Sequence, residues 1–276
     1  MRAIFYVFSG TGNTRMAAKE FADRLTDRGA ETVVEAMERN ATSSDEFDVI
    51  AICYPIHAFS APEIVLEFVK KLPKIKKGGK KVFFLKTSGE PLGYNKSSSS
   101  RAKAILTRKG YDVTGEYWYV MPYNMLYRHY DSMATKRWCA AKRMIARDVT
   151  ALLAGTRVHI RYGTPVSFLF RIVEQPFMKL NGRFFRVDKD KCVGCNLCVK
   201  NCPRDNIKVV DGKYTFGGNC IGCVRCSFSC PKDAIRIGII NFWKVNGKYT
   251  FGEVEPEVAE CKYLKKAYEK YFEDNR

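Results

Sequence analysis

The sequence of 276 residues lacks a long hydrophobic run. Its longest stretch without Asp, Glu, Lys or Arg, residues 49–62, contains two prolines and is shorter than the ~20 apolar residues that a membrane-spanning helix needs. The apolar residues 1–8 are too few for a secretory signal peptide, and Ser9 and Gly10 follow them directly. We therefore expect a soluble, cytoplasmic protein.

Acidic residues are scarce relative to basic ones. The chain has 47 Lys and Arg against 29 Asp and Glu, a net charge of +18, and residues 70–81 alone hold seven lysines. This excess fits a basic surface that is simply solvated, or one that binds a nucleic acid, an anionic membrane or an acidic protein. It also fits basic side chains that offset the charge of bound anions. The sequence has no base-reading or stacking motif, so we expect no nucleic-acid partner. We expect no membrane partner either.

Histidine is rare, and none lies between residues 160 and 276, yet the same part of the chain is rich in cysteine. Two runs of the form C-x2-C-x2-C-x3-C-P, residues 192–203 and 220–231, repeat with a shift of 28. In a chain without a secretory signal, clustered cysteines indicate metal rather than disulfides. Zinc sites usually pair two C-x2-C units across a loop, often with His, so this pattern favours iron–sulfur clusters.

Each run can contribute three closely spaced thiolates to one cubane cluster, while its fourth cysteine, before the proline, reaches the neighbouring cluster. We therefore expect two [4Fe–4S] clusters. Cluster 1 would be held by Cys192, Cys195, Cys198 and Cys230, and cluster 2 by Cys202, Cys220, Cys223 and Cys226. The region resembles the bacterial two-cluster ferredoxins. Those are usually acidic, whereas residues 186–238 hold ten Lys or Arg against five Asp, which implies an acidic redox partner.

Residues 1–155 alternate strand and helix patterns. Strands are predicted at residues 2–8, 31–37, 47–54, 80–86 and 112–120, and helices at 13–28, 60–72, 98–109 and 131–154. This alternation predicts an α/β fold with a five-stranded, doubly wound parallel sheet. Ligands of such sheets bind at the carboxyl ends of the strands, near the switch in strand order.

The first predicted strand ends in FSGTGNTR, residues 8–15, which has the composition of a phosphate loop. A nucleoside-triphosphate loop would need Lys followed by Ser or Thr, and a dinucleotide loop would need glycine in place of Arg15. The remaining groups are the hydroxyls of Ser9, Thr11 and Thr14 and the amides at the start of a helix, which bind phosphate without a cation. In this position the motif resembles the FMN-phosphate loop of flavodoxins.

The resemblance to flavodoxins implies that FMN is held by this loop and by the loops after the third and fourth strands. The residues implied are Ser9, Gly10, Thr11, Gly12, Asn13, Thr14, Tyr54, Pro55, Ile56, His57, Ala58, Phe59, Thr87, Ser88, Gly89 and Tyr94. The resemblance does not identify which aromatic ring stacks on the flavin. The aromatic loop at residues 121–130 lies on the same edge and could line a substrate pocket or cover the linker.

The whole chain resembles the flavodoxin–ferredoxin fusion proteins of anaerobes. The expected domains are a flavodoxin-like FMN domain, residues 1–155, and a small α+β two-cluster ferredoxin domain, residues 186–238. A packed linker, residues 156–185, joins them. The C-terminal residues 239–276 are expected to form a hairpin around Asn246 and a helix from 255 to 272.

The resemblance to these fusions implies an FMN- and [4Fe–4S]-dependent oxidoreductase. A ferredoxin-like one-electron donor would reduce the clusters, and FMN would then reduce a small molecule or a downstream protein. The alternative is a non-catalytic carrier that relays electrons between redox proteins. The sequence has no nicotinamide fingerprint, so we do not expect direct use of NAD(P)H. It identifies no catalytic residue.

Overall fold

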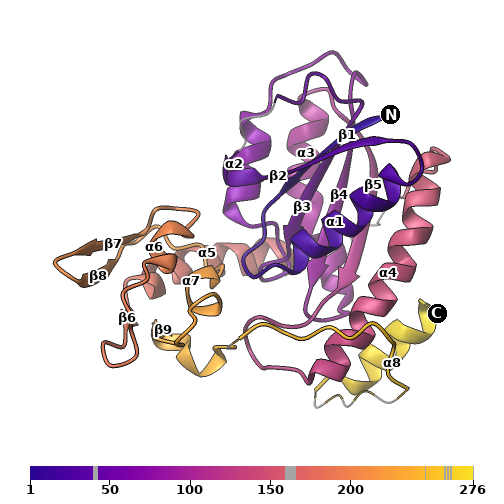
Figure 1. Ribbon diagram of the computed structural model, residues 1–276. Coiled ribbons are helices and arrows are strands. Elements are labelled where there is room, and N and C mark those ends of the chain that lie inside the picture. Colours follow the sequence, from indigo (N-terminus) through magenta and orange to yellow (C-terminus); the bar gives the residue numbers. More distant parts are fainter. Residues whose placement is uncertain are drawn as a thin grey trace.

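A parallel five-stranded sheet forms the centre of the N-terminal domain (Figure 1). The computed structural model describes residues 1–39, 43–158, 166–245, 247–257, 259, 261 and 263–275. The strands are β1 (Arg2–Val7), β2 (Glu31–Ala36), β3 (Val49–Pro55), β4 (Lys81–Ser88) and β5 (Asp112–Val120). Their order is β2-β1-β3-β4-β5, which is the flavodoxin-like doubly wound order with its switch between β1 and β3. The predicted fold class is therefore confirmed.

Helices cover both faces of this sheet, which explains why β3 and β4 are apolar along nearly their whole length. On one face lie α1 (Asn13–Thr26) and α4 (Asp131–Leu153), and on the other α2 (Glu63–Lys71) and α3 (Ser100–Arg108). Short 3-10 turns, η1 (Met37–Arg39) and η2 (Gly93–Ser99), complete the domain. Helix α2 begins later than predicted because Pro62, which occupies its N-cap position, marks the start of the helical backbone.

The cysteine-rich part projects from the carboxyl edge of the sheet and is reached through helix α5 (Val166–Gly182) (Figure 1). Its elements are β6 (Phe185–Val187), α6 (Leu197–Lys200), β7 (Ile207–Val210), β8 (Lys213–Phe216), α7 (Arg225–Phe228), β9 (Ile235–Ile237) and η3 (Gly238–Trp243). Strands β6 and β9 pair antiparallel, as do β7 and β8. Most of the segment predicted as a linker is thus helical. Met178 anchors α5 by packing into the core of the cysteine-rich part.

The two cysteine runs have the same backbone structure. Helices α6 and α7 begin at positions 28 residues apart, and the residues before them, Asn196 and Val224, both have left-handed φ angles, 57° and 47°. The amide of Asn206 donates to Cys202 Sγ at 3.3 Å, and the amide of Ala234 donates to Cys230 Sγ at the same distance. The sequence repeat is therefore also a structural repeat.

The C-terminal segment returns to the N-terminal domain and ends in α8 (Lys265–Asp274) (Figure 1). The predicted hairpin turn at Asn246 lies outside the described residues, and its flanks form no strand pair. Val245 and Tyr249 instead pack into a buried cluster. The helix predicted from residue 255 begins only at Lys265, because Leu264 before it has a left-handed backbone with φ 56°. No helix in the described part of the chain is long and apolar enough to cross a bilayer.

Candidate cofactor sites

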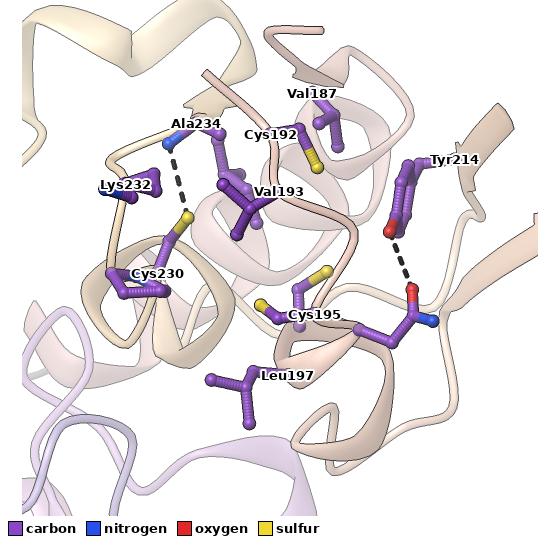
Figure 2. Close-up of a pocket in the computed structure, with 13 residues that line it drawn as sticks. Val187, Cys192, Val193, Cys195, Leu197, Tyr214, Cys230, Lys232 and Ala234 are labelled. Atoms are coloured by element: carbon purple, nitrogen blue, oxygen red, sulfur yellow. Dashed lines mark hydrogen bonds between the residues drawn. The ribbon is translucent and has the colours of Figure 1, made fainter. Parts of the chain in front are cut away.

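The first set of predicted cluster ligands surrounds one pocket near the surface. Cys192, Cys195, Cys198 and Cys230 all line it, and Figure 2 shows the first, second and last of them together with Tyr214. Cys195 is exposed, and so is Val193 between it and Cys192, with 60% of its surface accessible. A redox centre held by these thiolates would therefore be open to a partner from outside.

The second set of predicted ligands lies deeper. Burial raises the pKa of the Cys226 thiol, and the charges of Cys223, Cys220 and Cys202 raise it further. Burial likewise raises the pKa of Cys223 to about 12, with Cys220 and Cys202 again among the neighbouring charges. These four thiols therefore lie close together. Free thiols would stay protonated here, whereas binding to iron deprotonates them.

A cavity of about 670 Å³ opens at the carboxyl ends of β1, β3 and β4, within the size range of small-molecule and cofactor sites. It is lined by the phosphate loop, by the loops after β3, β4 and β5, and by segments of the C-terminal part. The residues are Ser9, Gly10, Thr11, Asn13, Thr14, Pro55, Ile56, His57, Ala58, Phe59, Thr87, Ser88, Gly89, Glu90, Leu92, Met121, Pro122, Tyr123, Asn124, Met125, Leu126, Val173, Glu174, Phe177, Met178, Gly222, Cys223, Val224, Ile240 and Trp243.

The phosphate loop is folded around one hydroxyl group. Ser9 Oγ accepts hydrogen bonds from the amides of Gly12 at 3.1 Å and Arg15 at 3.4 Å. Gly12 has a left-handed φ of 110°, which a residue with a side chain rarely adopts. The loop leads directly into α1, with Gly12 at the N-cap position. The first amides of this helix have no partner within the helix and are suited to bind an anion.

The other side of the phosphate loop carries polar side chains from neighbouring strands. The hydroxyls of Thr14 and Thr87 are 2.7 Å apart and hydrogen-bonded. Asn124 Nδ2 donates to Thr11 Oγ1, while its buried Oδ1 has no partner among the described residues. A buried amide oxygen accepts hydrogen bonds, so one without a partner indicates a site that a donor group of a bound ligand, not its phosphate, completes. The neutral hydroxyls and the backbone amides at the start of α1 fit the phosphate of FMN.

Most of the predicted flavin contacts line this cavity, but Gly12, Tyr54 and Tyr94 do not. The Tyr54 side chain is fully buried in the sheet core, because it lies on the face of β3 opposite to that of Cys53. Tyr94 is 46% exposed and contacts the edge of Phe59, with 5.7 Å between the ring centroids. Tyr54 and Tyr94 therefore do not reach the cavity.

Four non-glycine residues around this cavity have left-handed backbones. They are Ala58, Phe59, Leu126 and Val224, with φ angles of 39°, 60°, 88° and 47°. Such conformations cost about 1–3 kcal/mol each and are concentrated at binding sites and active sites. Their gathering here supports the cavity as the functional site of the N-terminal domain.

Two titratable side chains, His57 and Glu174, lie on the wall shared with the cysteine-rich part. Burial lowers the pKa of His57 to about 4, against a hydrogen bond to the backbone of Ile221 that raises it. The imidazole is therefore neutral at physiological pH. Burial, together with the charge of Glu63, raises the pKa of Glu174 to about 7.

The cavity and the second set of cysteines are in direct contact. Cys223 lines the cavity, and a Cβ added to Gly10 would lie 2.4 Å from the Cys223 carbonyl oxygen. Only glycine therefore allows the phosphate loop to approach this cysteine so closely. Arg225 reinforces the contact by donating a hydrogen bond to the carbonyl of Ser9 at 2.9 Å.

One wall of the cavity was not predicted from the sequence. Val173, Glu174 and Phe177 of α5, together with Ile240 and Trp243 of η3, close the side that faces the C-terminal part. The apolar and aromatic composition of residues 166–185 is the sequence signal that could have indicated the residues of α5. It could not indicate which of these side chains face the sheet edge.

Comparison with known proteins gives one family match and a set of similar solved structures. Residues 185–208 match the family model described as a 4Fe-4S binding domain. The sequence matches no curated protein. Similar solved structures include a flavodoxin of Streptococcus pneumoniae TIGR4, with 18% identity and a TM-score of 0.43 over 56% of this chain and 99% of that one. Oxidised flavodoxin 1 of Bacillus cereus has 14% identity and a TM-score of 0.44 over 56% and 98%.

Two-electron reduced flavodoxin of Megasphaera elsdenii is 28% identical, with a TM-score of 0.35 over 43% of this chain and 85% of that one. The flavodoxin-like fold itself is established here by the strand order. Fold and cysteines define an electron-transfer protein of the iron–sulfur class. The chain combines a flavodoxin-like domain with a 4Fe-4S binding domain, an arrangement similar to that of flavodoxin–ferredoxin fusion proteins.

Proposed function

We propose that this chain is an FMN- and [4Fe–4S]-dependent oxidoreductase. It would move electrons between a ferredoxin-like one-electron donor, two [4Fe–4S] clusters and FMN, with the flavin reducing a substrate or a downstream protein. One observation carries the proposal: Cys223, assigned to cluster 2, lines the cavity formed by the phosphate loop. Bound clusters pass single electrons and FMN accepts one or two, so the pair connects one-electron donors to two-electron chemistry.

The residues of the cavity suit FMN. Thr11 and Thr14 offer hydroxyls, and the start of α1 offers amides, so the phosphate needs no basic side chain. Phe59 and Tyr123 supply aromatic surface for the flavin ring further along the same cavity. The flavin would thus be anchored at the phosphate loop and sandwiched by the loops after β3 and β5.

Two clusters are proposed because both cysteine runs are built alike. The family model covers only the first run, at residues 185–208, and the second repeats its cysteines, its helix and its left-handed turn. Cys202 and Cys230, the fourth cysteines, each accept an amide hydrogen bond, which stabilises a thiolate ligand. The hydrogen bonds are the same in both halves, which supports two equivalent clusters.

The outer position of cluster 1 makes it the proposed entry point for electrons. Lys191, Lys200 and Lys232 are exposed around the pocket or close to its ligands in sequence. A basic surface beside an exposed redox site favours an acidic protein donor, and its association should weaken as salt increases. We therefore propose an acidic ferredoxin-like partner that docks at this pocket.

The covering of the cavity supports an enzyme rather than a simple carrier. A carrier needs an exposed flavin edge for its protein partners, whereas α5 and η3 contribute Phe177, Ile240 and Trp243 to a third wall here. A walled cavity next to a flavin provides a space from which a small acceptor can displace water. This feature favours a small-molecule acceptor over a downstream protein.

Metal and flavin analysis of the anaerobically purified protein tests the proposal. We expect about eight iron atoms and one FMN per chain, with the absorbance of both cofactor types. A reduced ferredoxin-like donor should then bleach the flavin, and a small acceptor should reoxidise it in a single turnover. Zinc in place of iron, or no flavin, would overturn the proposal. Reoxidation by proteins alone, across a broad panel of acceptors, would establish the electron carrier instead.

A further inference from the structure

The cavity has two chemically different sides. The side at the sheet edge presents hydroxyls and amides from the phosphate loop and from Asn124. The opposite side is apolar, with Phe177 of α5, Trp243 of η3 and Leu126 of the loop after β5. The polar side is used by the proposed flavin phosphate, so the apolar side is the part available to a second ligand.

Charge distinguishes this cavity from the rest of the molecule. The chain carries a net charge of +18, yet no Lys or Arg is among the described residues that line the cavity. Its two acidic side chains are Glu90 and Glu174. Glu90 accepts a hydrogen bond from Asn95 at 3.0 Å, and Glu174 lies on α5 between Val173 and Phe177 on the apolar side. An anionic ligand would lose its hydration there without gaining a cationic partner.

The rim of the apolar side is itself apolar and accessible. Val173 lines the cavity and is still 62% exposed, and Leu126 and Trp243 are also exposed lining residues. Figure 1 shows α5 between the sheet and the cysteine-rich part. These accessible side chains offer an apolar molecule a surface to contact at the edge of the cavity.

We propose that the α5 side of this cavity binds an uncharged, flat, apolar acceptor of the quinone or conjugated-ketone class, and that it discriminates against anionic analogues. This inference rests on the proposed function, because only a bound flavin beside the site makes such a ligand an acceptor. Reducing a quinone to a hydroquinone takes two electrons and two protons, which the one-electron donor protein and water would supply. Conjugation makes such acceptors flat, and flat rings suit a wall of Phe177 and Trp243.

A matched pair of inert probes tests the preference for neutral ligands by equilibrium binding. Oxidised, flavin-loaded protein is titrated with 2-naphthalenemethanol and with naphthalene-2-sulfonate, which share one flat ring system and do not react with thiols. Calorimetry should give an affinity for the neutral probe that is about tenfold or more higher. Equal or tighter binding of the sulfonate, or no binding of the neutral probe, would overturn the inference.

Matched variants locate the site on α5. Val173→Asp should weaken binding of the neutral probe about tenfold, whereas Leu180→Asp, on the same helix, 51% exposed and not a lining residue, should leave it unchanged. Glu174→Gln should raise the affinity for the sulfonate, and Glu257→Gln, at an exposed site, should not. Equal effects of Val173→Asp and Leu180→Asp on binding of the neutral probe would contradict the inference.

Cofactor content separates this inference from the function on which it rests. Each sample is assayed for flavin and iron before the titration. A chain that binds no flavin refutes the proposed function itself. A chain that holds flavin and clusters and yet shows no preference between the probes refutes only the ligand class proposed here.

Discussion

Arg225 donates a hydrogen bond from its guanidinium group to the carbonyl oxygen of Ser9 at 2.9 Å, and so joins the cluster-2 loop to the phosphate loop. Its Nη1 atom pairs with Glu38 at 2.7 Å and donates to the carbonyl of Asn201 at 3.2 Å. Both side chains of the ion pair are largely buried. One arginine, between Cys223 and Cys226 in sequence, therefore fixes how the two proposed cofactors face each other.

Replacing this arginine should loosen the junction between the domains. Arg225→Ala leaves Glu38 without its partner in a largely buried position, and we expect a loss of about 3 kcal/mol in unfolding free energy. Electron transfer from the clusters to the flavin should slow about tenfold because the geometry is less fixed. Rapid mixing of the oxidised protein with a reduced donor measures this rate. Arg236→Ala, at an exposed site on β9, is the control. An unchanged transfer rate in Arg225→Ala would show that the contact has no part in electron flow.

The close approach of the two loops gives a second prediction. Gly10→Ala would place a methyl group 2.4 Å from the carbonyl oxygen of Cys223, so one backbone must move. We expect the unfolding free energy to fall by about 1–3 kcal/mol and the absorbance of the bound flavin to change. Gly93→Ala is the control, since a Cβ there meets nothing within 4 Å. Equal melting temperatures for the two variants would contradict the described contact.

The sequence contained enough information for the fold and for the place of the loop after β1 at the carboxyl edge of the sheet. Strands β1 and β3 are short apolar runs bounded by turns, so their parallel pairing and the site at their carboxyl ends follow from general rules. The side taken by Tyr54 does not follow, because β3 is apolar on both faces and its pattern shows no buried or exposed side. In the structure, Tyr54 belongs to the core cluster on the face covered by α2 and α3.

The wall formed by α5 and η3 could not be predicted from local patterns. Val173 and Trp243 are 70 residues apart and reach one cavity only because the cysteine-rich part docks on the sheet edge. That docking depends on close contacts such as Gly10 with Cys223 and on single polar pairs such as Arg225 with Ser9. Such contacts leave no periodic signal in the sequence.

The threonines of the phosphate loop should determine flavin affinity. Removing the hydroxyls with Thr11→Ala and Thr14→Ala takes away two donors to a charged phosphate, at about 1.5–3 kcal/mol each. The double variant should therefore bind FMN more weakly by about a hundredfold or more, measured by flavin fluorescence, while its iron content stays the same. Thr26→Ala, at the far end of α1, should bind FMN normally. Retention of tight FMN binding by the double variant would mean that the phosphate lies elsewhere.

Asp148 should make stability depend on pH. Burial raises the pKa of this carboxyl to about 6, against a hydrogen bond from Tyr119 at 2.8 Å that lowers it. The folded state therefore keeps a proton that the unfolded state loses near pH 4, and stability falls as pH rises through 6. Relative to Asp148→Asn, the parent chain should lose about 1 kcal/mol between pH 5 and pH 7. Urea unfolding at both pH values measures this difference. Asp23→Asn, at an exposed site, keeps Asp148 and should lose as much stability between these pH values as the parent chain.

Removing one cysteine ligand of cluster 1 should remove that cluster alone. Cys195 belongs to the exposed set, so Cys195→Ser should lose cluster 1 and retain cluster 2 and the flavin, with about four iron atoms per chain. Reduction of the flavin by a protein donor should then slow sharply, because the entry site is gone, whereas a small reductant that reaches the cavity should still reduce it. Cys139→Ser, a buried cysteine in α4 outside both sets, should keep all the iron. Unchanged reduction of Cys195→Ser by the protein donor would mean that electrons enter at cluster 2 instead.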